Sequence, residues 1–127
     1  MTILFMIRVL ITTESRYPAD RKIIRERAIK VLTEHGVKGK AEVEIGIVGD
    51  RKMKELHKKY MNDDSTTDVL SFPLEDRGPD GVLRLGMVVV SFPQAMKDAI
   101  EENILVDEKI AFLVSHGILH LLGIHHE

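Results

Sequence analysis

The stretch from Glu108 to Glu127, EKIAFLVSHGILHLLGIHHE, combines an apolar helical pattern with four of the protein's six histidines. His116 and His120 are four residues apart, so on an α-helix both side chains leave from one face, close enough to share one ion. Gly123 is expected to end this helix, because glycine tolerates the left-handed backbone of a helix terminus. The chain can then turn back and deliver His126 to the same point. The stretch therefore predicts a metal-binding helix at the C-terminus, and Asp107 is its expected cap.

The spacing H-x-x-x-H-x-x-G-x-x-H is the ligand spacing of the metzincin zinc peptidases, including the glycine that ends the helix. It predicts His116, His120 and His126 as the ligands of one Zn²⁺, in a metzincin-like helix arrangement. Three neutral imidazoles leave one tetrahedral position open for water, as a hydrolytic zinc site requires. His125 competes with His126 for the third place. The alternative is that a helix histidine is a hydrogen-bonded core residue and that the terminal HHE is a solvated tail or the remnant of a tag.

One residue within this pattern argues against peptide hydrolysis. In the peptidase motif H-E-x-x-H a glutamate follows the first histidine and acts as the general base. Here that position is Gly117. A metal-activated water can still attack a phosphodiester, because the cation lowers the pKa of the water and neutralises charge on phosphate oxygens.

The rest of the sequence alternates strand-like and helix-like segments. Apolar residues occupy every second position of AEVEIGIV, residues 41–48, which is typical of a half-buried strand. Pro18 near the start and Gly36 as a stop bracket an amphipathic helix. The sequence predicts strands at residues 3–12, 41–48, 67–73 (ending at Pro73) and 83–91, a hairpin-type turn at 75–81, and helices at about 18–36, 50–61 (capped by Asp50), 94–103 and 108–122. The fold class is α+β, with a small mixed sheet of about four strands packed with helices.

Composition sets limits on the classes of partner. The length of 127 residues favours a single domain, 1–127, and 44% hydrophobic residues can supply its core. A net charge of −2 gives no global attraction to nucleic acid, so an RNA partner needs a local basic patch. Cysteine is absent, which leaves imidazole and oxygen as metal ligands and mildly favours a cytoplasmic location. The apolar run TILFMIRVLI is about half a membrane span long and contains Arg8, so a strand is expected rather than a signal peptide or membrane anchor.

With these residues assembled, the chain resembles the YbeY family of bacterial RNA-processing endoribonucleases. HGILHLLGIHH matches the family's H-G-x-L-H-L-x-G-x-D-H except that His125 replaces the aspartate, and TDVLSFP, Thr67–Pro73, matches a second family block. LGMV corresponds to a third block, L-G-D-I, while residues 1–50 match only in their strand, helix, strand pattern. The resemblance implies a compact α+β domain whose metal helix lies over a small mixed sheet, with His116, His120 and His126 as zinc ligands.

The resemblance also implies a function. Its members are cytoplasmic, metal-dependent endoribonucleases that act on single-stranded RNA, in maturation of the small-subunit ribosomal RNA 3′ end and in ribosome quality control. We therefore expect RNA and ribosomal or small-subunit proteins as partners, and no DNA. Two rivals are kept: a zinc metallopeptidase-like hydrolase with its base elsewhere than Gly117, and a non-catalytic, ribosome-associated zinc-binding module.

Besides His125, the chain departs from the family pattern at three further places. Met61 stands where the family usually has an arginine, and Met87 where it has an aspartate. A guanidinium can clamp a phosphate through two hydrogen bonds and methionine cannot, so Lys58 or Lys59 is the candidate substitute. The sequence also stops at Glu127, where family members commonly continue, which is consistent with a truncated chain or a short natural form. A third ligand so close to a chain end is expected to hold metal less tightly.

Several further residues carry expectations. We expect His116, Lys59 and Asp68 to take part in catalysis, with Asp68 fixing the tautomer of a ligating histidine, although a strand-start hydrogen bond is an equal alternative. Ser71 is a second candidate for lining the site. No side chain is a secure general base. Aromatic residues make up only 5% of the chain, so Phe72 and Phe92 are expected in the core, while His35 and His57 lack partner spacing and are assigned to the surface.

Overall fold

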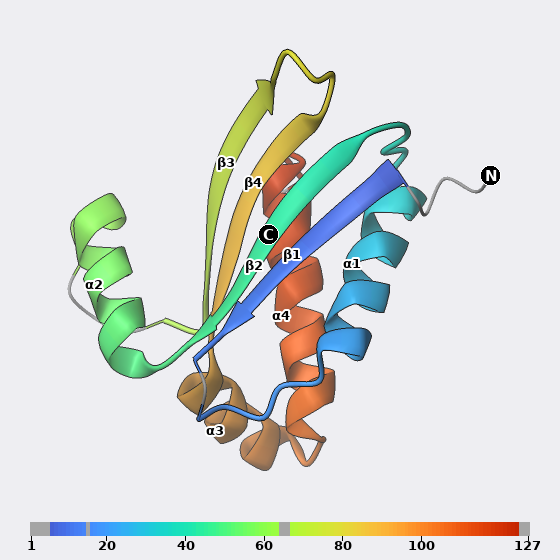
Figure 1. Ribbon diagram of the computed structural model, residues 1–127. Helices are drawn as coiled ribbons and strands as arrows, with labels where there is room; N and C mark the ends of the chain where they lie inside the picture. The colour runs from blue at the N-terminus through green and yellow to red at the C-terminus, as the bar shows by residue number, and fades with distance from the viewer. Residues whose placement is uncertain (1–5, 15, 64–66, 125–127) are drawn as a thin grey trace.

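The computed structural model of the protein describes residues 6–14, 16–63 and 67–124. Within these residues, four strands and four helices follow one another in an α+β arrangement (Figure 1). The fold class predicted from the sequence is confirmed. In chain order the elements are β1 (Ile7–Thr13), α1 (Arg21–Glu34), β2 (Ala41–Val48), α2 (Asp50–Met61), β3 (Val69–Arg77), β4 (Leu83–Ser91), α3 (Phe92–Glu102) and α4 (Val106–Leu121).

The strands form one mixed sheet in the order β1-β2-β4-β3. β1 pairs with β2 in parallel, because α1 carries the chain back between them. β2 pairs with β4 in parallel, because β3, which runs in the opposite direction, returns the chain before β4 begins. β3 is antiparallel to β4, and the turn between them is closed by a hydrogen bond from the Gly81 N–H to the Gly78 carbonyl. This is the hairpin that the glycine- and proline-rich segment predicts. β1 and β3 are therefore the edges of the sheet, and β4 lies inside it.

One face of the sheet is covered by α1 and α4 (Figure 1). Val43, Ile45 and Ile47 of β2 are at most 1% exposed, as the alternation in that segment predicts. Among the described residues, 21 buried side chains form one hydrophobic cluster on this side, drawn from β1, β2, β4 and the helices α1, α3 and α4. Removal of this apolar surface from water is the main stabilising term of the fold.

Within the described residues, the opposite face is mostly uncovered. α2 stands at one end of it (Figure 1), where Met53 packs against Leu70 and Val89 in a cluster of three buried residues. α2 is strongly amphipathic, and Met53 is its buried residue. The sheet is thus held from one side, and its other side is available to a ligand.

Side-chain caps fix where α1 and α3 begin. The Asp20 carboxylate accepts hydrogen bonds from the N–H groups of Lys22 and Ile23, at 3.0 and 3.2 Å. The Ser91 hydroxyl accepts from the Gln94 N–H at 3.2 Å. Both satisfy main-chain donors that the first turn of a helix leaves unpaired.

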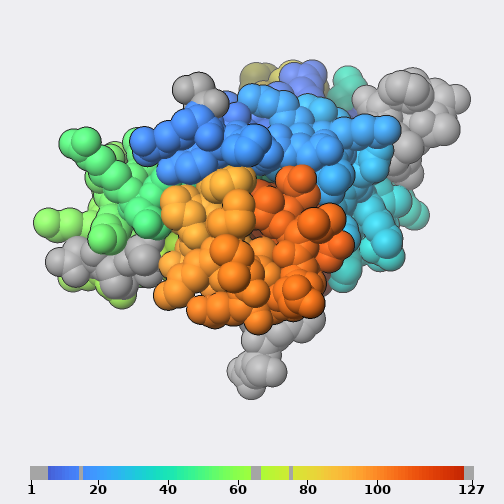
Figure 2. Space-filling view, turned by 90° about the horizontal axis from the view of Figure 1, so that it is seen from below, coloured from blue at the N-terminus to red at the C-terminus, as the bar shows by residue number. Residues whose placement is uncertain are grey.

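The segment between β1 and α1 closes the end of the domain where α3 and α4 meet (Figure 2). The rings of Tyr17 and Phe92 stack there with centroids 4.8 Å apart. Phe92 is 7% exposed, so its expected place in the core is confirmed. The Asp107 carboxylate accepts a hydrogen bond from the Asp20 N–H at 3.2 Å, which joins the start of α4 to the start of α1.

Three local predictions need correction. β3 does not end at Pro73 but runs to Arg77, because β3 is an edge strand and tolerates a residue without an N–H, with a register shift between Pro73 and Asp76. Asp50 is the first residue of α2, and Gly49 is its N-cap. Asp107 lies in the first turn of α4 after the N-cap Leu105, and its carboxylate serves Asp20 instead.

Candidate functional site

His116 and His120 lie one turn apart on the last helix, as their spacing predicts. Their ring centroids are 4.7 Å apart and both side chains are half-buried. The exposed ring of Phe112 follows one turn earlier, 6.4 Å from His116. Two imidazoles at this separation on one face of a rigid helix are suited to bind one cation. Their role as metal ligands remains a prediction.

Gly117, between the two histidines, is where α4 comes closest to the sheet. A Cβ atom at this position would lie 2.5 Å from Val88 Cγ1 and 3.1 Å from Ser71 Oγ. The Ser71 hydroxyl donates a hydrogen bond of 3.0 Å to the Gly117 carbonyl. The position of the peptidase glutamate is therefore occupied by side chains of β4 and β3, so a side chain here would have to displace that of Val88.

The contacts of α4 also decide which way the histidines face. Ser115 lies toward α1, because Arg27 of α1 donates to its hydroxyl at 3.4 Å. Gly117 lies against Val88 and Ser71. At about 100° per residue, His116 and His120 then project from the flank of α4 turned away from α1, beside the edge strand β3. The histidine pair therefore borders the rim of the sheet and not its core.

α4 ends as the glycine predicts. Gly123 has a φ of +79°, and its N–H donates to the His120 carbonyl at 3.0 Å, while the Ile124 N–H donates to the Leu119 carbonyl at 2.9 Å. These two bonds form a Schellman motif, which ends a helix and redirects the chain. His125 and His126 lie outside the described residues, so the choice of third ligand stays a prediction.

α2 supplies the basic side chains of this region. Its sequence holds five lysines and arginines against two carboxylates, although the whole protein is slightly acidic. Lys58 and Lys59 lie in its last turn and are exposed, and within the described part of the chain neither makes an ion pair. Lys59 Nζ lies 5.2 Å from the centre of the Tyr60 ring. The expected catalytic role of Lys59 is untested, but its place on a basic helix end fits a phosphate contact.

A pocket of about 500 Å³ lies between the C-terminal half of α2 and the edge of the sheet. Its wall is largely apolar, and the Ser71 hydroxyl adds a polar group that also contacts α4. Tyr60 and Met61 are 55% and 52% exposed at its rim. The residues that line it are Leu56, Tyr60, Met61, Ser71, Phe72, Pro73 and Met87.

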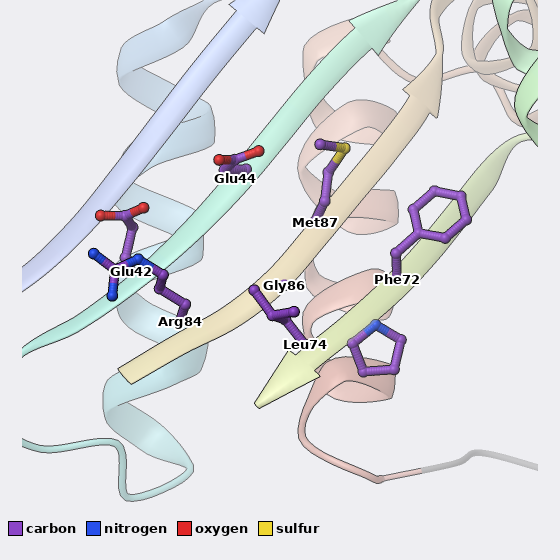
Figure 3. Close-up of a pocket in the computed structure, with 8 residues that line it drawn as sticks. Glu42, Glu44, Phe72, Leu74, Arg84, Gly86 and Met87 are labelled. Atoms are coloured by element: carbon purple, nitrogen blue, oxygen red, sulfur yellow. The ribbon is translucent and has the colours of Figure 1, made fainter. Parts of the chain in front are cut away.

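Two of the positions that depart from the family pattern, Met61 and Met87, line this pocket. Figure 3 shows Met87 and Phe72 projecting from the face of the sheet opposite α4, together with Glu42 and Glu44. Phe72 is half-buried, and its ring packs 4.9 Å from that of Tyr60. It belongs to the pocket wall as well as to the core, so its assignment to the core alone was incomplete.

Asp68 lies one residue before β3, and its main-chain carbonyl accepts a hydrogen bond from the Ser91 N–H at 2.9 Å. This bond uses the main chain, so both alternatives for the Asp68 side chain stay predictions. Two residues separate Asp68 from Ser71, whose hydroxyl contacts the Gly117 carbonyl. The role of its carboxylate toward the histidines stays a prediction.

The uncovered face carries a second, smaller hollow next to the first, lined by acidic and apolar groups (Figure 3). Glu42 forms an ion pair of 3.7 Å with Arg8. The Arg84 guanidinium donates a hydrogen bond to the Asp80 carboxylate in the hairpin. This bond, and to a smaller extent the hydrogen bond from the Val82 N–H, lowers the pKa of Asp80 below its usual value. With Arg84 also in its lining and Glu42 paired to Arg8, this part of the face carries nearly balanced charge, in contrast to the basic end of α2.

The sequence reasoning missed Tyr60 and placed one histidine wrongly. An aromatic residue in the last turn of a basic amphipathic helix was the available signal for Tyr60. His35 is exposed, as expected. The His57 side chain is only 15% exposed and lies 4.0 Å from Asp63, so its assignment to the surface was wrong.

The fold and the site define a class of protein: a small α+β domain that presents a histidine pair on its last helix beside a basic helix and an apolar pocket. Comparison with known proteins identifies the family. The model of the family described as Endoribonuclease YbeY matches residues 11–127. This chain belongs to the YbeY endoribonuclease family.

Two relatives and one solved structure illustrate the match. An Endoribonuclease YbeY from Moorella thermoacetica is 43% identical over 100 residues, which cover 72% of this chain and 64% of the relative. One from Persephonella marina is 38% identical over 123 residues, covering 96% of this chain and 80% of the relative. The solution structure of TM1509 from Thermotoga maritima superimposes with a TM-score of 0.60 at 29% identity, covering 96% of this chain and 75% of that one.

The matched part of this chain spans less than two thirds of the length of the Moorella relative. None of the helices in the described ranges has the length and hydropathy to cross a bilayer.

Proposed function

We propose that this protein is a zinc-dependent endoribonuclease that cuts single-stranded RNA. Membership of the YbeY family supports the reaction class. The single observation that carries the zinc proposal is the His116–His120 pair, with ring centroids 4.7 Å apart on one flank of α4. Imidazole is a ligand that zinc prefers, and the chain contains no cysteine to compete with it.

Among the described residues, the imidazoles of His116 and His120 are suitable zinc ligands. In the described ranges no group of three or more histidines, carboxylates or thiols is assembled. The third ligand of the proposal is His126, just beyond the Schellman motif at Gly123, with water in the fourth position. A zinc ion bound there would supply Lewis acidity, lowering the pKa of water and neutralising charge on phosphate oxygens.

The chain's own residues support a phosphodiester as the substrate rather than a peptide. The contact of Gly117 with Val88 excludes the glutamate base of a zinc peptidase from its usual place. Lys58 and Lys59 place positive charge at the end of α2, where RNA phosphates can be bound and oriented. Positioning of the strand by these lysines is therefore the contribution we assign to α2.

The biological role in this proposal follows the family resemblance. The protein acts in the cytoplasm on ribosomal RNA, in maturation of the small-subunit 3′ end and in ribosome quality control. Its partners are single-stranded RNA and proteins of the ribosome or small subunit. A basic helix on an otherwise slightly acidic protein supports an RNA partner held by one local patch.

Substitution of a histidine tests the zinc proposal. His120→Ala is expected to lose bound metal and RNA cleavage while the fold is retained, because the core lies on the other side of α4. Elemental analysis, circular dichroism and cleavage of a single-stranded RNA, each with and without chelator, measure this. His35→Ala, at the exposed end of α1, is the matched control and should keep metal and activity. Full-rate cleavage by His120→Ala would overturn the ligand assignment.

Two further assays separate the rivals. Cleavage of an unstructured protein by the zinc-saturated enzyme would favour the metallopeptidase. A protein that unfolds when its metal is stripped, and that does not cut RNA when metal is present, would favour the non-catalytic zinc-binding module. RNA cleavage that is lost with chelator and restored with zinc would exclude both.

A further inference from the structure

We propose that the pocket between α2 and β3 is a nucleobase subsite, in which one unpaired RNA base stacks on Tyr60. We call it the base pocket. This inference rests on the proposed function, because it names how the substrate is held. It assigns a binding role to Tyr60, Met61 and Phe72.

The size and chemistry of the base pocket fit a base. Its volume of about 500 Å³ falls within the range of small-molecule pockets. Tyr60 and Phe72 form an angled aromatic corner, with centroids 4.9 Å apart and planes inclined by 58°. Tyr60 is 55% exposed, so its ring has surface to offer to a ligand. Single-stranded RNA is characteristically bound by stacking of its unpaired bases on aromatic side chains.

Ser71 connects the base pocket to the histidines. Its side chain lines the pocket, and its hydroxyl donates to the carbonyl of Gly117, the residue that directly follows His116. The other lining residues of the base pocket include Phe72 and Met87, which lie on the face of the sheet opposite α4. In this proposal the RNA strand therefore passes around the β3 edge between the base pocket and the histidines.

Charge selects the path of the RNA backbone. Lys59 Nζ lies 5.2 Å from the Tyr60 ring centre. The phosphate of a nucleotide whose base stacks on Tyr60 would therefore lie near a positive charge. On the other side of Met87, Glu42 and Glu44 line the neighbouring hollow together with Arg84 (Figure 3), and Glu42 is paired with Arg8 at 3.7 Å. That hollow therefore lacks the excess positive charge of the α2 end. The backbone is thus directed along the lysine side of the base pocket.

The same charges favour an RNA base over an apolar peptide side chain as the occupant. The base pocket offers an aromatic ring for stacking, and next to it lie two lysines that lack ion-pair partners in the described ranges. This combination suits RNA, which has planar bases on an anionic backbone. Met61, where the family usually has an arginine, makes the rim of the pocket apolar. The contact is therefore expected to be tolerant of base identity, since every base has a stacking face.

The test measures binding without cleavage. A short single-stranded RNA carrying 2-aminopurine at one position is titrated with the full chain in chelator, and both anisotropy and fluorescence quenching are recorded. Tyr60→Ala should weaken binding by roughly tenfold and remove the quenching, as expected for loss of one stacked base. Tyr60→Phe keeps the ring and should behave as wild type. Ile100→Ala removes an exposed apolar side chain from α3, 72% exposed against 55% for Tyr60, and is the control.

The outcomes separate this inference from the proposed function. Quenching and affinity that survive in Tyr60→Ala, with thermal melting unchanged, would overturn the base pocket while leaving the nuclease proposal intact. Ring-dependent binding of an RNA that the zinc-loaded protein does not cut would support the base pocket and contradict the nuclease. Displacement of the RNA by an uncharged apolar peptide at equal concentration would assign the pocket to a peptide and overturn the inference.

Discussion

The two faces of the sheet differ in what covers them. The face toward α1 and α4 is sealed by 21 buried residues within the described ranges, whereas the other face has three, gathered at the α2 end. Leu74, on the uncovered side, is 59% exposed, while Ile118, on the covered side, is fully buried. Along β2, Val43 and Ile45 are buried and Glu44 between them is exposed, so neighbouring residues of one strand meet a packed core or water depending on which way they point.

This difference separates the face that stabilises the fold from the face that can bind a ligand. The covered face holds the fold together, and the uncovered face bears the pockets, the carboxylates of β2 and the ring of Phe72. The histidine pair lies at the boundary, because α4 packs on the covered face while its histidines reach the β3 edge. A well-packed helix can thus present a site at the rim without loosening the core.

The largest expected effect is in the covered face. Ile118→Ala should lower the free energy of unfolding by about 2–5 kcal/mol, the usual range when a buried aliphatic side chain leaves a cavity. Leu74→Ala, its counterpart on the uncovered face, should change it by about 0.5 kcal/mol or less. Urea denaturation followed by circular dichroism measures both. Equal losses from the two substitutions would mean that the uncovered face is buried in solution.

The close approach of α4 to β4 predicts a smaller loss. Gly117→Ala inserts a methyl group against Val88, at an overpacking cost of about 1–3 kcal/mol, which exceeds the gain of about 1 kcal/mol from better helix propensity. The net destabilisation should be about 1 kcal/mol. Adding Val88→Ala should produce a favourable coupling in a double-mutant cycle. Strictly additive effects would contradict the contact on which the exclusion of a peptidase base depends.

The smallest effect on stability is expected at the end of α2. Lys59→Ala should leave the unfolding free energy unchanged but weaken single-stranded RNA binding, and the slope of log affinity against log salt should fall by about 1. Lys30→Ala, on exposed α1, should do neither. Anisotropy titrations over a salt series give the slope. An unchanged slope for Lys59→Ala would remove this lysine from the phosphate path.

Local patterns in the sequence predicted much of the fold, and non-local contacts explain where they failed. The alternation of residues 41–48 coincides with β2, because burial on one face imposes a period of two. Pro73 was taken as the end of a strand, but whether proline is tolerated depends on the edge position of β3, which no local pattern states. Asp107 was taken as a cap, and its partner is Asp20, 87 residues away.

The candidate site also has a part that local sequence patterns predict and a part that depends on non-local contacts. The four-residue spacing of His116 and His120 and the glycine at 123 are helix properties, so the sequence alone predicted the pair and the helix end. The base pocket brings the end of α2 against β3 and β4, and the ring of Tyr60 meets Phe72 only through that packing. Tertiary contacts of this kind leave no fixed spacing in the sequence. The pocket therefore became visible only in the structure.

The interior position of β4 sets an order of assembly during translation. β4 joins β2 to β3, and its parallel pairing with β2 matches Ala41 to Leu83 across all of α2 and β3. The platform that receives Gly117 is incomplete until β4 has emerged from the ribosome, and α4 emerges later still. A nascent chain therefore displays the lysines of α2 before it can present the two imidazoles, and it gains them only when its last helix docks.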